Sequence, residues 1–213
     1  MAINYNIEAA VVDITTDTPK AGDAFMVDTN VWYWLTYSRA SQSARPPANY
    51  QTSHYPNYTN AALGSGARIF QSGLSLAELT HLIEKAEYEI FAQANPAIFP
   101  NPSKFDKNFR HDRTHERRQA VSEIEAAWAQ VASLAEPLTV TIDSPTATSA
   151  LNRLQTEKVD GYDLFILESM RNHGVVQVIT DDGDFATVPG IQVFTANRNV
   201  IQAARAQGRL ITR

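Results

Sequence analysis

The chain of 213 residues fits one domain with insertions and is long enough to bury a core of ordinary size. A hydrophobic share of 44% and a charged share of 19% exclude a mainly disordered chain, and no apolar run is long enough to span a membrane. The net charge of -5 argues against broad non-specific binding to nucleic acid, although a local basic patch could still bind it.

The N-terminal residues are polar and acidic where a secretory signal would be basic and then apolar, so we expect a cytoplasmic protein. Residues 24–27 form a short apolar run that ends in Asp28, and residues 30–40 have the apolar content of a helix. Residues 41–60 are rich in Ser, Pro, Asn and Tyr, which predicts an irregular loop. A strand over residues 73–77 and a helix over residues 78–92 follow.

The second half of the chain again alternates between strand and helix signals. Residues 95–110 predict another loop, and Ser144-Pro145 and Gly174 mark the beginning and the end of helices. Helices are expected over residues 113–134, 144–157, 161–173 and 199–206, and strands over residues 138–142, 175–179 and 191–195. This alternation predicts a three-layer α/β/α fold with a mostly parallel central sheet.

Four acidic residues fall where the working site of such a sheet is expected, outside the carboxyl ends of the strands. Asp28 and Asp182 follow strands, whereas Glu78 and Asp163 are expected in the first turn of a helix. Each residue alone is explained equally well as a cap or a turn residue. Together they would repel one another without a cation, and carboxylates are the ligands that Mg²⁺ and Mn²⁺ prefer. The absence of cysteine excludes thiolate ligands, cysteine nucleophiles and disulfides.

The motifs around these acids resemble those of the PIN-domain nucleases, which include the VapC-type toxins of toxin-antitoxin pairs. The resemblance covers roughly residues 24–195 and rests on four motifs, which are Val27-Asp28-Thr29-Asn30, Ser75-Leu-Ala-Glu78-Leu, Asp163-Leu-Phe-Ile and Ile179-Thr180-Asp181-Asp182-Gly183-Asp184-Phe185. The family pattern of Thr, any residue, Asp, any two residues and Phe selects Asp182 over Asp181. An N-terminal extension (1–23) and insertions near 41–72 and 95–118 depart from the family.

The resemblance implies a Mg²⁺- or Mn²⁺-dependent endoribonuclease in which Asp28, Glu78, Asp163 and Asp182 bind one or two metal ions. The ions would activate water and stabilise the leaving oxygen. Asn30, Thr180 and Asp184 would orient the carboxylates through hydrogen bonds. RNA is the expected substrate, and an antitoxin and a homodimer are possible partners.

The densest cationic stretch of the chain lies between residues 104 and 118. Its cations could meet phosphates while its aromatic side chains stack on bases, or the stretch could be a solvated helix face with internal ion pairs. The residues concerned are Lys104, Lys107, Arg110, Arg113, Arg117 and Arg118. His111 and His115 are four residues apart but lack a third ligand, which argues against a zinc site.

Three alternatives explain the sequence less well. A phosphatase of the haloacid dehalogenase type would carry a second Asp at position 30, which is Asn. A glycosidase needs only two carboxylates and leaves the others unexplained. A non-cleaving PIN-like module that binds RNA or a protein would have no need for so much buried negative charge.

Overall fold

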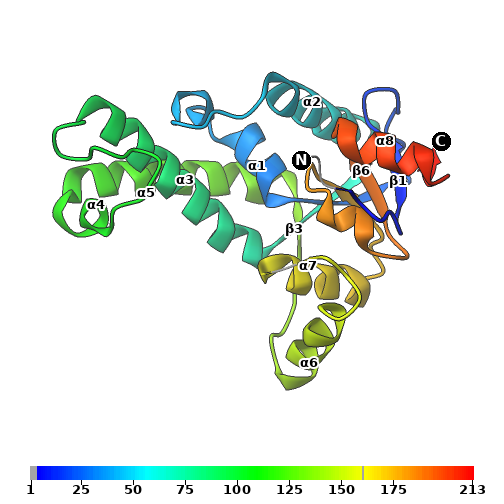
Figure 1. The fold of residues 1–213 in the computed structure, drawn as a ribbon. Helices are drawn as coiled ribbons and strands as arrows, with labels where there is room; N and C mark the ends of the chain where they lie inside the picture. Colours follow the sequence, from blue (N-terminus) through cyan, green and yellow to red (C-terminus); the bar gives the residue numbers. More distant parts are fainter. Residues whose placement is uncertain (1–3, 160) are drawn as a thin grey trace.

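A seven-stranded parallel sheet forms the centre of the protein, which is described by a computed structural model over residues 4–159 and 161–213 (Figure 1). The strands lie in the order β4-β3-β2-β5-β6-β1-β7. They are β1 (Ala10–Asp13), β2 (Ala24–Val27), β3 (Arg68–Ser72), β4 (Glu136–Leu138), β5 (Gln177–Ile179), β6 (Gln192–Thr195) and β7 (Leu210–Ile211). The predicted three-layer α/β/α fold is confirmed.

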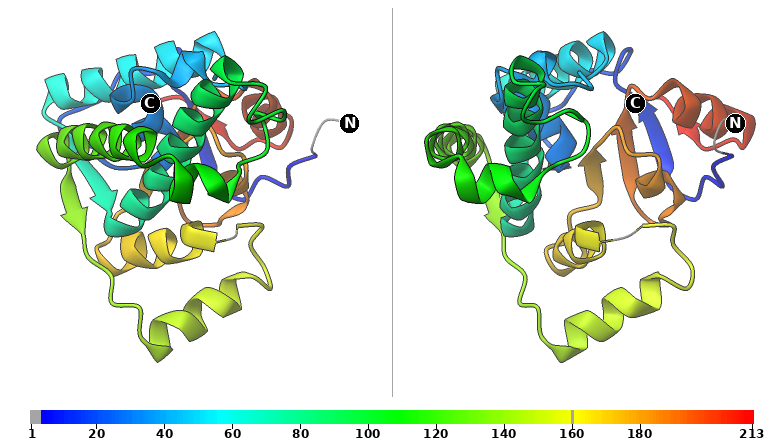
Figure 2. Two further views of the ribbon diagram at one scale, coloured as in Figure 1. Left: turned by 90° about the vertical axis from the view of Figure 1, so that its left-hand side faces the viewer. Right: turned by 60° about the vertical axis from the view of Figure 1, so that its left-hand side comes forward.

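Side chains alternate between the two faces of the sheet, and each face has its own group of helices. Phe25 and Val27 pack on one face, whereas Met26 packs on the other. The first face is covered by α1 (Thr29–Thr36), α2 (Asn49–Ser65), α3 (Gly73–Ala94) and α5 (Thr114–Leu134). The second face is covered by α6 (Ser144–Arg153), α7 (Gly161–Asn172), the 3-10 helix η2 (Asp184–Thr187) and α8 (Arg198–Ala206). In the right-hand view of Figure 2, α2, α3 and α5 lie on one side of the sheet and α8 on the other.

The order of the strands reverses at β2, which pairs with β3 on one side and with β5 on the other. Ligand sites of open parallel sheets form at such a reversal, outside the carboxyl ends of the strands. Asp28 directly follows β2, and Asp182 follows β5 after two residues. The backbone N–H of Asp28 donates to the carbonyl of Ile179 (3.1 Å) and joins the two strand ends. The fold therefore places both acids beside the reversal point.

The irregular loop expected over residues 41–60 is wrong, because most of it belongs to helix α2 and the short 3-10 helix η1 (Ala40–Gln42). The buried residues Tyr55, Tyr58, Thr59 and Ala62 recur at helical spacing and pack towards the sheet. Tyrosine side chains that looked typical of a surface loop are the apolar face of this helix. The Ala48 backbone N–H, which donates to Gln51 Oε1 (2.8 Å), marks its beginning.

The strand expected over residues 73–77 is also wrong, because these residues form the first turns of α3. The strand lies earlier, in β3, within the stretch that had been assigned to an insertion. The Ser72 side chain accepts a hydrogen bond from the Leu74 N–H (3.2 Å) and caps the helix. Glu78 consequently lies in the second turn of α3 and not in the first.

The remaining differences concern short elements. The N-terminal extension contains β1, which pairs with β6 and β7, and the loop over residues 95–110 contains the beginning of α4 (Lys107–Asp112). The strand expected over residues 138–142 is the shorter β4, which ends at Leu138. These strands of two to four residues are formed through pairing with distant segments, and such pairing leaves little local signal.

Helices α3, α4 and α5 extend beyond the sheet as an arm, on the left of Figure 1. Its tip is held by an aromatic cluster in which the Tyr88 ring contacts Phe99 and Phe109, each at 5.5 Å between ring centres. The Glu84 side chain on α3 accepts from Arg110 of α4 and pairs with Arg117 of α5 (2.9 Å). No helix in the described part of the chain is both long and apolar enough to cross a membrane.

Candidate active site

Asp28 is the most deeply buried acid at the carboxyl edge of the sheet, with 4% of its surface exposed. It precedes α1 but makes no side-chain cap, so its carboxylate is not used to hold that helix. Its Oδ2 accepts a hydrogen bond from the Thr180 hydroxyl (2.7 Å). Burial raises the pKa of Asp28 to about 7, the Thr180 hydrogen bond opposes this shift, and the negative charges of Glu78 and Asp182 add to it.

Glu78 approaches this edge from α3. Its Oε2 is buried and has no hydrogen-bond partner among residues 4–159 and 161–213, and the same holds for the Ser75 hydroxyl one turn earlier and for the hydroxyl of Thr29 beside Asp28. Buried polar atoms without partners are rare in native proteins and each calls for an explanation, of which an ion or a water is one. Glu78 itself, a residue one turn before it and the residue after Asp28 thus each carry such an atom.

Asp182 is held by a tight turn after β5. Its backbone N–H donates to the Thr180 hydroxyl oxygen (2.9 Å), and its Oδ1 accepts from the Asp184 N–H (2.8 Å). The Thr180 hydroxyl thus accepts a hydrogen bond from the backbone of Asp182 and donates one to the carboxylate of Asp28. The predicted orienting role of Thr180 has this geometric basis, and Asp184 contributes through its backbone.

Asp181 has a different environment from its neighbour. Its carboxylate accepts hydrogen bonds from the hydroxyls of Tyr50 (3.0 Å) and Tyr55 (2.6 Å) and from the Gln51 side-chain amide (2.7 Å), all on α2. Its carbonyl accepts from the Asn197 side chain (2.8 Å). Asp181 therefore anchors α2 to the sheet edge, while the negative charge of Asp182 acts on Asp28.

Sequence reasoning missed the tyrosines around these acids. Tyr50 and Tyr55 had been assigned to a loop, and Tyr5 lies in the N-terminal extension. Burial raises the pKa of Tyr5, and Asp184, Asp182 and Asp181 raise it further, so its hydroxyl lies near the acidic turn and stays protonated. The Tyr5 ring packs against Gly183 in this turn, and the sequence contains no signal for that contact.

The other two predicted residues are less closely tied to this centre. Asp163 is half-buried in the first turn of α7, a helix that packs against α3, which carries Glu78. Asn30 lies in the first turn of α1, two residues after Asp28. The structure thus brings Asp28, Glu78 and Asp182 within electrostatic reach of one another and places Asp163 on an adjoining helix.

The chemistry of the site fits a hard divalent cation. Its donors are carboxylate oxygens, one of them buried without a partner, and no arginine or lysine in the described chain forms an ion pair with Asp28, Glu78 or Asp182. Within residues 4–159 and 161–213, no three His, Asp or Glu side chains are grouped closely enough to bind one ion together. Mg²⁺ is usually held by one or two carboxylates and keeps several waters.

The basic stretch lies on the arm, and part of it is structural. Arg110 and Arg117 are engaged by Glu84, and the Arg113 guanidinium lies over the rings of Phe91 and Phe99, each at 6.0 Å. Lys104, Lys107 and Arg118 are exposed. The stretch therefore divides into arginines that hold the arm and cations that are open to solvent.

Comparison with known proteins adds one finding. The family model described as PIN domain matches residues 25–191, from β2 to the residue before β6. The match includes the positions of Asp28, Glu78, Asp163 and Asp182. The chain has no significant match among curated proteins or solved structures.

Proposed function

Because the chain belongs to the PIN domain family, we propose that it is a metal-dependent nuclease, and more closely a VapC-like endoribonuclease. The observation that carries this proposal is the uncompensated negative charge at the strand reversal. Asp28 is buried beside Glu78 and Asp182, and its raised pKa reports that the folded chain disfavours its ionised form. A divalent cation would remove this cost, because it favours the ionised form of the carboxylate.

Asp28, Glu78, Asp163 and Asp182 would hold Mg²⁺ or Mn²⁺. When bound, the cation supplies electrostatic stabilisation for the charge that develops on the phosphate oxygens during hydrolysis. Thr180 fixes the rotamer of Asp28 through its hydroxyl and the position of Asp182 through the backbone. The turn from Thr180 to Asp184 thereby fixes the carboxylates of Asp28 and Asp182 relative to each other before substrate binds.

RNA is the proposed substrate, and the cytoplasm the proposed place of action, in agreement with the absence of cysteine. An antitoxin protein and a second copy of the chain are the proposed partners. Chromatography of the purified chain with light scattering measures its oligomeric state directly.

The experiment that tests the proposed function is incubation of the purified chain with labelled RNA and DNA in Mn²⁺, in Mg²⁺ and in chelator. We expect cleavage of RNA in the metal-containing reactions only. The Asp182→Asn protein, prepared identically, controls for contaminating nucleases. Equal cleavage by this variant, or binding of RNA without cleavage in any metal, would replace the nuclease with a binding module.

A further inference from the structure

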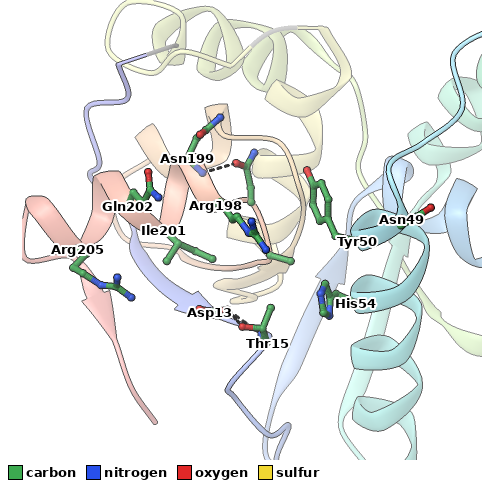
Figure 3. Close-up of a pocket in the computed structure, with 12 residues that line it drawn as sticks. Asp13, Thr15, Asn49, Tyr50, His54, Arg198, Asn199, Ile201, Gln202 and Arg205 are labelled. Atoms are coloured by element: carbon green, nitrogen blue, oxygen red, sulfur yellow. Dashed lines mark hydrogen bonds between the residues drawn. The ribbon is translucent and has the colours of Figure 1, made fainter.

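A cleft of about 730 Å³ opens beside the acidic edge, between α2 and α8 (Figure 3). One wall is α2, which contributes Tyr50 and His54. The opposite wall is α8 with the residue before it, which contributes Asn197, Arg198 and Arg205. The floor includes Asp13, the last residue of β1, and Thr15. In Figure 3, Arg198 points into the space that faces Tyr50 and His54.

The cleft is cationic in a chain whose net charge is -5. Arg198 and Arg205 are exposed, and neither takes part in an ion pair within the described residues. Asp13 is the acid that lines it, and its Oδ1 already accepts from the N–H (2.9 Å) and the hydroxyl (2.6 Å) of Thr15. Two free guanidinium groups therefore face a space with one occupied carboxylate, an arrangement that attracts anions.

The cleft is continuous with the acidic edge. Tyr50 donates to the Asp181 carboxylate, and Asn197 donates to the Asp181 carbonyl (2.8 Å), so both walls are attached to the residue beside Asp182. The cleft follows β6 and β1, which are the next two strands after β5 in the sheet. Since neighbouring strands lie about 4.8 Å apart, the cleft begins roughly one strand width from Asp182.

We infer that this cleft binds the part of a single-stranded nucleic acid that flanks the phosphate to be cut, a role that rests on the proposed nuclease function. Arg198 and Arg205 contact phosphates, and the rings of Tyr50 and His54 are available for stacking on bases. Guanidinium groups and aromatic rings along one groove are the usual means of binding single strands without reading their sequence.

The test is binding of labelled single-stranded RNA and DNA of about 12 nucleotides, a length within the usual site sizes for single strands. Binding is measured by fluorescence anisotropy in chelator, where the strand stays intact. We expect the Arg198→Ala, Arg205→Ala double variant to lose about tenfold or more in affinity. The slope of log K against log salt should fall by about 1.4, because each single-strand phosphate contact contributes about 0.7. Both arginines are exposed, so the melting temperature should match wild type.

Arg209→Ala is the matched control. Arg209 is also exposed but precedes β7 at the amino end of the strands and does not line the cleft, so this variant should leave affinity unchanged. A double variant with the affinity and salt slope of wild type would overturn the cleft assignment, and so would an equal loss in Arg209→Ala.

A second measurement separates this proposal from the nuclease function. Cleavage of bis(p-nitrophenyl) phosphate, a diester too small to fill the cleft, should proceed equally in wild type and double variant, while KM for the oligonucleotide rises. Binding that depends on the two arginines, without any metal-dependent cleavage, would support the cleft as a binding site and refute the nuclease function. Cleavage by a double variant with unchanged KM would keep the nuclease and refute the cleft.

Discussion

Two groups of buried acids in this protein have opposite electrostatic surroundings. Glu84, on the arm, is 3% exposed and contacts Arg110 and Arg117. Burial alone would raise the pKa of Glu84, but these arginines lower it below its ordinary value. Asp28, at the sheet edge, is 4% exposed, and its pKa is raised to about 7 by burial and by two further acids. Burial is the largest cause of the raised pKa of Asp28, and no cationic side chain opposes it there as Arg110 and Arg117 do at Glu84.

The comparison separates acids that hold the fold from acids that await a ligand. Glu87 is engaged by Arg39 (2.7 Å) and the Tyr37 hydroxyl (2.6 Å), and Glu168 by Arg153 (2.6 Å). A buried carboxylate with such partners is satisfied by the chain itself. Asp28 and Asp182 accept hydrogen bonds from Thr180 and from backbone, but neither forms an ion pair with an arginine or lysine among residues 4–159 and 161–213. Substitutions in the two groups should therefore affect different properties.

The largest effect is expected from the edge acids. Asp28→Asn, Asp163→Asn and Asp182→Asn should each reduce cleavage of RNA at least about a thousandfold, roughly 4 kcal/mol of transition-state stabilisation, since each removes a ligand charge. Unfolding of the variants in chelator should show no loss of stability. The measurement is single-turnover cleavage in Mn²⁺ beside thermal unfolding.

Asp181→Asn is the matched control for Asp182→Asn. Its carboxylate holds α2 through Tyr50, Gln51 and Tyr55, so stability should fall by about 1–3 kcal/mol while appreciable activity remains. An inactive Asp181→Asn protein beside an active Asp182→Asn protein would reverse the assignment of the two acids.

The next effect tests the arginine-paired group. Arg153→Met leaves the buried Glu157 without its arginine and Glu168 with Arg171 alone, and breaking a buried ion pair typically costs about 3–5 kcal/mol. For a chain of this size the melting temperature should fall by roughly 10 °C. The change lies on α6, outside the edge acids, so activity per folded molecule at low temperature should be preserved. A melting temperature equal to wild type would mean that the paired acids do not hold the helices together.

A smaller effect is expected from metal binding. At a metal concentration about 100 times Kd, binding to the native state contributes about 2.7 kcal/mol, or roughly 5–10 °C in melting temperature. The rise should be larger near pH 8 than near pH 5, because protons compete with the ion for Asp28, whose pKa is about 7. Differential scanning fluorimetry in Mn²⁺ and in chelator, at pH 5 and at pH 8, measures the rise in melting temperature and its dependence on pH.

The Asp28 carboxylate also determines how the free energy of unfolding changes with pH in chelator. The folded pKa of Asp28 lies above its unfolded value, so its contribution is fully present below about pH 4 and is lost as the pH rises through about 7. Asp28→Asn should lack this loss and most of the metal-induced rise. A variant that retains the full rise would exclude Asp28 as a ligand.

The contrast between the two groups explains what the sequence could and could not predict. Asp28 and Asp182 follow short apolar runs. An acid after a buried parallel strand lies at the carboxyl edge of the sheet, where ligand sites form, even when other elements are predicted wrongly. Glu84 and Glu168 lie inside helices, and their partners Arg110, Arg117 and Arg153 come from other segments of the chain. No local pattern distinguishes such an acid from a solvated one.

The same reasoning applies to the elements that were missed. The tyrosine-rich helix α2 has helical spacing only in Tyr55, Tyr58, Thr59 and Ala62, while the flanking Pro and Asn residues favour a loop. Strand β7 pairs with β1, and β1 pairs with β6 as well, so both depend on distant segments for their pairing. The role of Asp181 could not be predicted, since its partners lie on the helix that had been assigned to a loop.

The smallest effect is expected from the exposed cations of the arm. Lys104, Lys107 and Arg118 make no ion pairs within the described residues. They belong to the segment around α4 and the beginning of α5, on the arm that extends away from the sheet (Figure 1). Replacing all three with Ala should weaken RNA binding less than about fivefold, within about 1 kcal/mol, because exposed cations act mainly through screened long-range attraction. Arg110→Ala, by contrast, removes a partner of Glu84 and should lower the melting temperature. A triple variant that loses as much affinity and salt slope as the Arg198→Ala, Arg205→Ala protein would show that the arm, and not only the cleft beside the edge acids, binds the strand.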